Sequence, residues 1–326
     1  MTRPREVTDG IVRTRLLPIA EVFLVVALWA SSFVAVRVVV AHAGPLTVAA
    51  LRYSMAAALL LPWVRWRSIR AASSKRWIWW RLTAIGVSQY TVGNAALFFA
   101  LTMVTPAAAS LSLALTPVAV WILEAVYLKE HPTRQQMLGS IVAVVACVLF
   151  FIEGATGIRA RAAGLLALAM ISFTVLPILG RQIARQRAVD TVTLTSLPLA
   201  IGGGILLVLA GAIEGIPSMP LSAWAIIVGL AVANTLAGYL LFNHALRHLR
   251  ASEANIILNL IPLGTALISW GALGDRLTPL QVAALGVAIG GITFGQRRGH
   301  VSDETVKASR AGRGAATGYR LPRSAR

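Results

Sequence analysis

The chain has 326 residues, of which 57% are hydrophobic and only 13% are charged, and its mean hydropathy is +0.74. A water-soluble domain of this length needs far more polar surface, so the composition excludes an ordinary soluble fold. The net charge of +18 could suit nucleic acid. However, the basic residues lie in short loops and tails rather than on one folded face, so membrane topology explains the charge and no nucleic-acid partner is expected.

The apolar residues are gathered into ten charge-poor blocks, most of them long enough for a helix to cross a hydrocarbon core about 30 Å thick. All should be helices, because lipid offers the backbone no other hydrogen-bond partners. The blocks of the first half are residues 17–40, 46–64, 78–101, 107–128 and 137–152. Those of the second half are residues 163–180, 192–213, 223–246, 252–273 and 280–295. The sequence therefore predicts an all-α polytopic membrane protein with ten transmembrane helices.

Lysine and arginine are divided unevenly between alternate loops, which predicts the orientation of the chain. The basic residues crowd into residues 1–16, 65–76, 129–134, 185–187, 247–250 and 297–326. The intervening loops are nearly bare, so both termini should face the cytoplasm from the cell inner membrane. Residues 1–16 are then a cytoplasmic segment. Residues 297–326, basic and rich in Gly, Ala and Ser, should be a disordered cytoplasmic tail near anionic lipid.

The first hydrophobic block allows one alternative, a cleaved signal peptide, because Arg13 and Arg15 precede it and Ala41-His42-Ala43 ends it. Its apolar run is longer than the core of an ordinary signal peptide. It also has a counterpart later in the chain. Both points favour a first helix that is retained.

The chain repeats itself when Pro117 is placed over Pro262. This register aligns the halves without a gap over about thirty residues. The matched pairs include Ala100 with Ala245, Leu113 with Leu258, Leu128 with Leu273 and Thr133 with Thr278. The repeats should cover residues 17–152 and 159–296. Each holds five spans, an odd number, so the second repeat must be inverted relative to the first, an arrangement found in many secondary transporters.

Short motifs in both repeats resemble a known family. The first span carries Trp29-Ala30-Ser31-Ser32-Phe33, which is similar to the motif that opens EamA-type members of the drug/metabolite transporter (DMT) superfamily. Each half also has a proline within a helix, an acidic residue after that helix and a glycine in the next span: Pro117, Glu130 and Gly139, then Pro262, Asp275 and Gly286. Asp275, in place of the usual Glu, and Glu124, inside a span, depart from the family pattern. The resemblance implies export of amino acids, similar metabolites or small toxic compounds.

Polar residues fall on matching faces of the paired helices, and exposing them to lipid would cost free energy, so a shared cavity is expected. Each proline removes a backbone hydrogen bond, and interruptions at corresponding positions of two halves indicate a binding site. The alternative is that the prolines only shape packing. The cavity candidates are Trp29, Ser32, Gln89, Tyr90, Asn94, Pro117, Trp121, Ser172, Asn234, Tyr239, Asn255, Asn259 and Pro262.

Three ionisable residues within the spans allow more than one interpretation. Glu124 is the candidate for coupling, because a buried carboxylate can carry a proton; alternatively it faces water and pairs with a base such as Lys129. Arg52 matches an arginine common in the second span of the family and either contacts an anion or extends outward to the interface. His244 has no evident acidic partner and is expected to be packed rather than to relay protons.

The sequence leaves three classes of function to compare. A secondary transporter is favoured by the inverted halves and by the lack of a GxxxxGK[ST] motif for ATP. An intramembrane enzyme is disfavoured because neither HExxH nor GxSxG occurs. A membrane scaffold or assembly factor is the remaining alternative. Gly202-Gly203-Gly204 is expected to pack helices closely rather than to bind phosphate, and Cys147 has no metal-ligand partner in its spacing. The sequence thus predicts a small-molecule exporter working by alternating access, with no metal or other cofactor and with protons as the candidate coupling ion.

Overall fold

The computed structural model describes residues 4–64, 76–116, 119, 134–152, 160–176, 179, 183, 189–215, 217–248 and 257–295. In these segments the chain folds into 10 helices without a β-strand, which confirms the predicted all-α class. Four candidate residues and the expected C-terminal tail lie outside the described residues: Pro117, Trp121, Glu124, Asn255 and residues 297–326.

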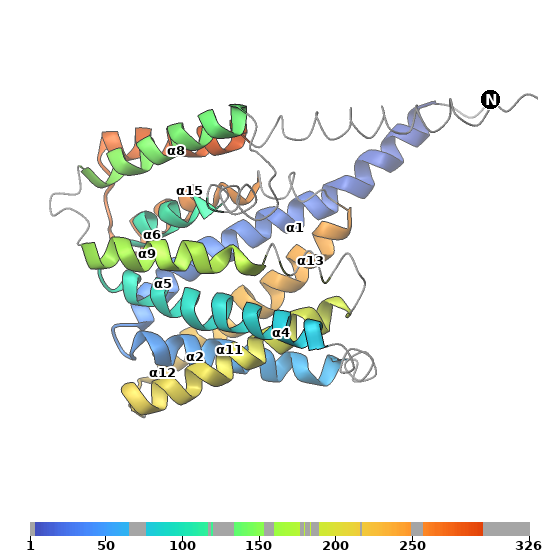
Figure 1. The fold of residues 1–326 in the computed structure, drawn as a ribbon. Coiled ribbons are helices and arrows are strands. Elements are labelled where there is room, and N and C mark those ends of the chain that lie inside the picture. Colours follow the sequence, from blue (N-terminus) through green and yellow to red (C-terminus); the bar gives the residue numbers. More distant parts are fainter. Residues whose placement is uncertain are drawn as a thin grey trace, which may run out of the picture.

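The helices of the first half follow the predicted spans closely. They are α1 (Pro4–Val39), α2 (Pro45–Leu60) with the short η1 (Leu61–Trp63), a long third helix made of α4 (Arg76–Ile85), η2 (Gly86–Gly93) and α5 (Asn94–Leu101), then α6 (Pro106–Leu113) and α8 (Arg134–Ile152). The first turns of α1 project beyond the other helices (Figure 1).

The second half has the same order of elements. It contains α9 (Ala160–Phe173), α11 (Thr191–Ile213), a long helix made of α12 (Leu221–Gly229), η4 (Leu230–Ala237) and α13 (Gly238–His248), then α15 (Ile261–Leu273) and a last helix at Pro279–Gly295. Among the described residues, five helices are long and apolar enough to cross a membrane: Leu16–Val39, Pro45–Trp63, Arg76–Leu101, Val192–Ile213 and Leu221–Phe242.

The packing of the helices relates the two halves by an inverted pseudo-two-fold symmetry. Counterpart helices pack on each other, α2 against α11 and α6 against α15. The first helix of each half packs on the third and fourth helices of the other half: α1 contacts α13 and α15, and α9 contacts α5 and α6. The predicted arrangement of two inverted five-helix repeats is therefore present.

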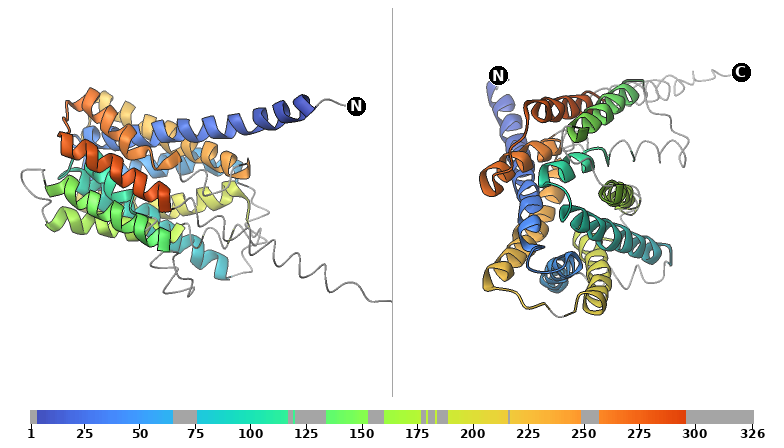
Figure 2. Two further views of the ribbon diagram at one scale, coloured as in Figure 1. Left: turned by 90° about the horizontal axis from the view of Figure 1, so that it is seen from above. Right: turned by 90° about the vertical axis from the view of Figure 1, so that its left-hand side faces the viewer.

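The last helices of the halves, α8 and Pro279–Gly295, lie side by side (Figures 1 and 2). Their hydrogen bonds are reciprocal. Gln135 Nε2 donates to the Phe294 carbonyl at 3.0 Å, and Gln281 Nε2 donates to the Phe150 carbonyl at 3.4 Å. A Cβ on Gly139 would overlap the backbone of the other helix, so a glycine is needed here for close approach. The exchange of equivalent contacts is what an inverted two-fold axis between the helices requires.

The start of α2 is held by a residue of the other half. Glu214, at the end of α11, accepts from the Leu46 N–H at 3.0 Å and from the Thr47 N–H and hydroxyl at 2.8 and 2.7 Å. These bonds satisfy donors that a helix N-terminus leaves free and place a negative charge at the positive end of the helix dipole. A side chain on Gly44 would overlap the Glu214 carboxylate. The two repeats are thus joined at this end of the bundle.

The expected close packing at Gly202-Gly203-Gly204 holds for the first two glycines. A Cβ on Gly202 would lie 2.5 Å from the Gly86 carbonyl oxygen of η2, and one on Gly203 would lie 2.9 Å from the Ser54 nitrogen of α2. A Cβ on Gly204 would have no neighbour within 4 Å. These glycines let α11 approach both helices without side chains between them.

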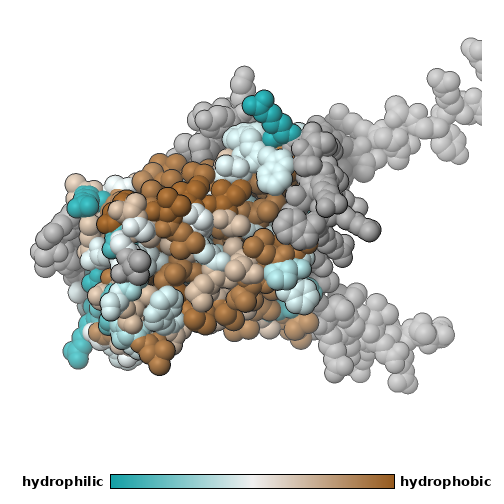
Figure 3. Space-filling model, turned by 90° about the horizontal axis from the view of Figure 1, so that it is seen from below, coloured by the Kyte–Doolittle hydropathy of each residue, from teal (hydrophilic) through white to brown (hydrophobic). Residues whose placement is uncertain are grey.

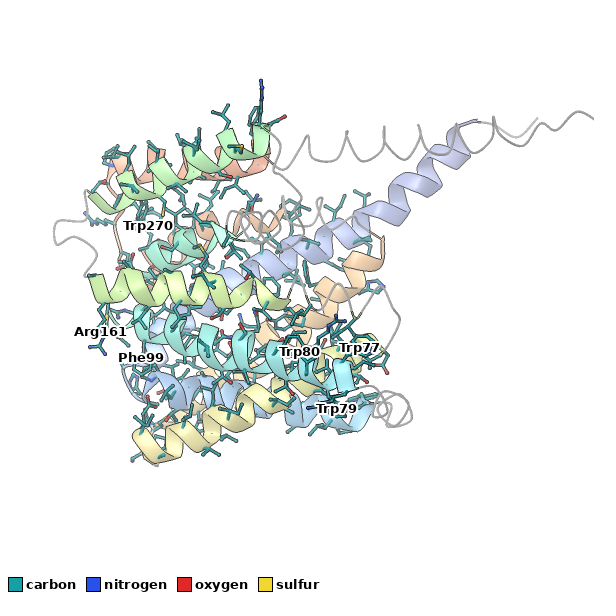
Figure 4. The ribbon with its side chains drawn as sticks, in the orientation of Figure 1. Trp77, Trp79, Trp80, Phe99, Arg161 and Trp270 are labelled. Carbon is teal, nitrogen blue, oxygen red and sulfur yellow. The ribbon has the colours of Figure 1, made fainter. Side chains whose placement is uncertain are left out.

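The outer surface suits a bilayer. One face is covered mainly by hydrophobic residues, with hydrophilic residues toward its margins (Figure 3). Apolar side chains such as Val208 are exposed on the outside of the protein. Trp77, Trp79 and Trp80 lie together at the end of the bundle where α4 begins, and Arg161 lies at the other end (Figure 4). Tryptophans prefer the membrane–water interface. We call the end where α4 begins the basic end, because it adjoins the Lys/Arg-rich residues 65–76.

Candidate substrate site

Both third helices contain a π-helical segment at equivalent positions, η2 in the first half and η4 in the second, each of 8 residues. In a π-helix each backbone N–H donates a hydrogen bond to the carbonyl five residues earlier. Two side chains here also donate to a carbonyl five residues earlier. Asn94 Nδ2 donates to the Gln89 carbonyl at 2.7 Å, and Thr235 Oγ1 donates to the Leu230 carbonyl at 3.1 Å. Wide turns of this kind are frequent at functional sites.

The fourth helices are interrupted at matching positions too. After α6, the Leu115 N–H donates to the Ser112 carbonyl at 3.2 Å, and before α15 the Leu260 N–H donates to the Ile257 carbonyl at 3.0 Å. Each bond spans only three residues, so the chain tightens at the same place in both repeats. Pro262 then lies in the first turn of α15, where its missing N–H costs no hydrogen bond. Four helices are therefore irregular in two equivalent pairs.

Arg52 of α2 lies in the interior, where α2 packs on η4 and α5 of the third helices, and is only 6% exposed. Its Nε donates to Thr235 Oγ1 at 2.8 Å and its Nη1 to Ser32 Oγ at 2.7 Å. Its guanidinium carbon lies 5.2 Å from the centre of the Tyr53 ring. The side chain therefore extends into the protein, and one residue from each repeat holds it.

Aromatic rings surround the guanidinium. The Tyr53 and Tyr90 rings are 5.5 Å apart, Tyr90 and Tyr239 are 6.4 Å apart, and Tyr239 and Trp29 are 5.5 Å apart, measured between ring centres. The Tyr53 hydroxyl donates to Asn94 Oδ1 at 2.6 Å. These contacts join α1, α2 and both third helices. We call the group the Arg52 cluster; its members are Trp29, Ser32, Arg52, Tyr53, Tyr90, Asn94, Thr235 and Tyr239.

Asn234 fixes α1 against η4. Its Nδ2 donates to the Leu28 carbonyl and, at 3.1 Å, to Ser31 Oγ, while its own carbonyl accepts from Trp29 Nε1 at 3.1 Å. A Cβ on Gly238 would lie 2.8 Å from Trp29 Nε1, so the indole fits against bare backbone. Asn234 thus positions Trp29 within the Arg52 cluster.

The other described candidates are buried or half-buried in different surroundings. Gln89 lies within η2, where its side chain contacts Tyr239 of the Arg52 cluster, while its Oε1 atom is buried with no hydrogen-bond partner. Ser172 of α9 is buried, and its carbonyl accepts from Ser88 Oγ at 2.9 Å. Asn259 and Pro262 are buried at the break before α15. The structure therefore brings together seven of the predicted cavity residues around Arg52 or beside it: Trp29, Ser32, Gln89, Tyr90, Asn94, Asn234 and Tyr239.

Sequence reasoning missed two members of the cluster. Tyr53 was not singled out, although it follows Arg52 directly. Thr235 aligned with Tyr90 in the repeat and could have been chosen on that ground.

The expectation that His244 has no acidic partner is wrong, because Glu21 of α1 lies 2.9 Å from its Nδ1 atom. The two residues are 223 positions apart in the chain. Only the packing of α1 on α13 brings them together, so no local pattern could have indicated the pair.

Two inverted five-helix repeats, with irregular helices around a polar interior, define a membrane transporter of the inverted-repeat class. A model of the EamA-like transporter family matches residues 17–152 and 160–294. The chain belongs to this family, within the drug/metabolite transporter superfamily, as its motifs indicated.

Several relatives are similar over most of the chain. The uncharacterized transporter YyaM of Bacillus subtilis is 24% identical over 269 residues, covering 80% of this chain and 88% of the relative. An uncharacterized transporter of Archaeoglobus fulgidus is 26% identical, covering 82% and 95%. A probable terminal-alkyne amino-acid exporter of Streptantibioticus cattleyicolor is 26% identical, covering 84% and 92%.

A solved crystal structure shares the fold, with a TM-score of 0.63 and 17% identity over 86% of this chain and 96% of that one. Together these likenesses identify a multi-pass membrane transporter.

Proposed function

We propose that this protein is a secondary transporter that exports an amino acid or a related small metabolite across the cell inner membrane by alternating access. The Arg52 cluster, which joins α1 and α2 to the irregular third helices of both repeats, carries the proposal. In transporters with inverted repeats, the substrate site lies at the junction of the halves and is built from interrupted helices. The Arg52 cluster occupies such a junction, because Ser32 and Thr235 come from different repeats.

The symmetry of the packing supports alternating access. When two inverted halves adopt slightly different conformations, exchanging those conformations turns a site open to one side into a site open to the other. The π-helical segments and the breaks near Leu115 and Leu260 are places where a helix can bend without losing a regular bond.

The distribution of charge supports the orientation of the chain in the membrane, and a relative supports the substrate class. The basic end should face the cytoplasm, because Lys and Arg are retained on that side. The Streptantibioticus relative is named a probable terminal-alkyne amino-acid exporter, which favours an amino-acid-like substrate here. Glu124 stays the candidate for carrying a coupling proton, and the substrate and the bilayer are the expected partners.

The test is transport by the purified full-length protein in proteoliposomes, using a panel of radiolabelled amino acids with and without a proton gradient. We expect accumulation of at least one solute, and we expect Asn94→Ala, Trp121→Ala and Asn259→Ala to reduce its rate at equal protein abundance. Val208→Ala is the matched control, because Val208 is 73% exposed on the apolar surface. Transport of no solute would overturn the proposal, and unchanged rates in all three variants would move the site away from these residues.

A further inference from the structure

We propose that Arg52 binds a carboxylate of the transported compound, while the rings of Tyr239 and Trp29 contact its apolar part. The inference rests on the proposed function, since it names the substrate chemistry of the same site. It assigns two requirements to the substrate, a carboxylate and an uncharged apolar portion, and it assigns the recognition of the carboxylate to one residue.

The first step is the charge. A guanidinium is always ionised in proteins, and burying a cation is costly unless an anion compensates it. Within the described part of the chain, Arg52 makes no ion pair; the one such pair found there joins His244 and Glu21. Its two hydrogen-bond partners, Ser32 and Thr235, are neutral hydroxyls. A buried cation with no anionic partner among the described residues, inside a membrane protein, indicates a site for an anionic ligand.

The second step is the unused donor group. Nε and Nη1 are engaged, whereas Nη2 donates to none of the described residues. A guanidinium fork binds a carboxylate through parallel N–H groups, and Nη2 with the second hydrogen of Nη1 forms such an edge. The hydroxyls of Ser32 and Thr235 fix the plane of the fork from two sides, so the edge is oriented before a ligand arrives.

The third step is the surroundings. The rings of the Arg52 cluster offer apolar faces and edges rather than carboxylates. Trp29 lies between Tyr239 and Phe242, with ring centres 5.5 and 5.4 Å away. Such faces pack well against an aliphatic or aromatic group, and they can also receive an ammonium group. The cluster thus matches an amphipathic acid in which one end is a carboxylate and the other is apolar.

The fourth step is the asymmetry of the site. α11 is the counterpart of α2, and its sequence from Thr191 to Ile213 contains no charged residue. The pseudo-two-fold axis therefore does not generate a second cation. One guanidinium in a pseudo-symmetric interior gives the carboxylate a single position, which orients the rest of the compound toward Tyr239 and Trp29 of the cluster.

The test measures binding by calorimetry to the purified full-length protein, with three probes that share a phenylethyl body. L-Phenylalanine has both a carboxylate and an ammonium group, 3-phenylpropionate has the carboxylate alone, and 2-phenylethylamine has the ammonium group alone. We expect the two carboxylates to bind and the amine to bind at least 10-fold more weakly, or not at all. The ratio of the two carboxylate affinities shows whether ring faces also receive the ammonium group.

Variants assign the effect to Arg52. We expect Arg52→Gln to weaken both carboxylates by about 10- to 100-fold, because it removes the charge and the fork. Arg52→Lys keeps the charge but not the fork, so it should retain part of the affinity and serves as the decisive variant if Arg52→Gln does not fold. Arg37→Gln is the matched control, since Arg37 Nη1 donates to the Leu101 carbonyl at the end of α5, away from the cluster.

Equal binding of the amine, binding of neither carboxylate, or unchanged carboxylate affinity in the folded Arg52 variants would each overturn the inference. The proposed function would survive such a result if the proteoliposomes still accumulate a solute. Conversely, Arg52-dependent carboxylate binding without transport of any solute would leave the binding site standing and refute the transporter proposal.

Discussion

Removing the carboxylate of Glu214 should destabilise the protein measurably, because it joins the end of α11 to the start of α2. Glu214→Ala leaves the N–H groups of Leu46 and Thr47 without their acceptors and removes a charge from the helix terminus. Losing a cap of this kind costs about 0.5 to 2 kcal/mol, and losing the charge costs about 0.3 to 1 kcal/mol. We expect about 2 kcal/mol for Glu214→Ala and about 1 kcal/mol for Glu214→Gln, which keeps one acceptor oxygen.

The assay is the apparent melting temperature of the detergent-purified protein at one fixed scan rate, since unfolding of membrane proteins is often irreversible. One kcal/mol of lost stability lowers the melting temperature by about 2 to 4 °C, so Glu214→Ala should lower the apparent melting temperature by about 5 °C. Gly44→Ala should cause a similar loss, because its methyl group would displace the same carboxylate. Gly211→Ala is the control, as a Cβ there would have no neighbour within 4 Å.

The double variant Gly44→Ala/Glu214→Ala tests whether the two substitutions act through the same carboxylate or cause two unrelated defects. If Gly44→Ala acts by displacing Glu214, then adding it to Glu214→Ala should cost little more, and the coupling should approach the smaller single effect. Additive losses, or a Glu214→Ala protein as stable as the wild type, would refute the reasoning.

Three further results are expected. Gly202→Ala should lower stability and abundance, because its Cβ would lie 2.5 Å from a backbone oxygen of η2, whereas Gly204→Ala should not. Single cysteines in a cysteine-free background should be labelled by an impermeant maleimide in intact cells at residues 217–220 but not at residues 65–75; the opposite pattern would reverse the orientation. Glu124→Gln should abolish accumulation driven by a proton gradient while sparing substrate exchange, and an unaltered pH profile would exclude Glu124 from coupling.

The helices and their inverted order could be predicted from the sequence, because hydrophobic length and the register of Pro117 with Pro262 depend on chemistry that is local or repeated. The π-helical segments could not. Their residues are as apolar and as helix-compatible as their neighbours, and only tertiary packing decides whether a bond reaches four or five residues back.

The residues around Arg52 were predicted only in part, because some of their contacts join helices that are distant in the sequence. Polar positions on matching faces indicated Asn94 and Asn234, since exposing them to lipid would be unfavourable, and the motif of the first span indicated Trp29. The direction of Arg52 depends on Thr235, which lies 183 residues later, and the partner of Glu214 lies in another repeat. Contacts between distant helices have no signal in a single sequence.

The way the halves interleave has a consequence for synthesis of the protein. α1 and α2 pack chiefly on the other repeat, so these helices of the first half enter the bilayer before their partners exist. During that interval Arg52 has only one of its two partners, because Ser32 precedes it in the chain and Thr235 is made much later. The nascent first half must therefore hold a charged helix in the membrane with half of its support.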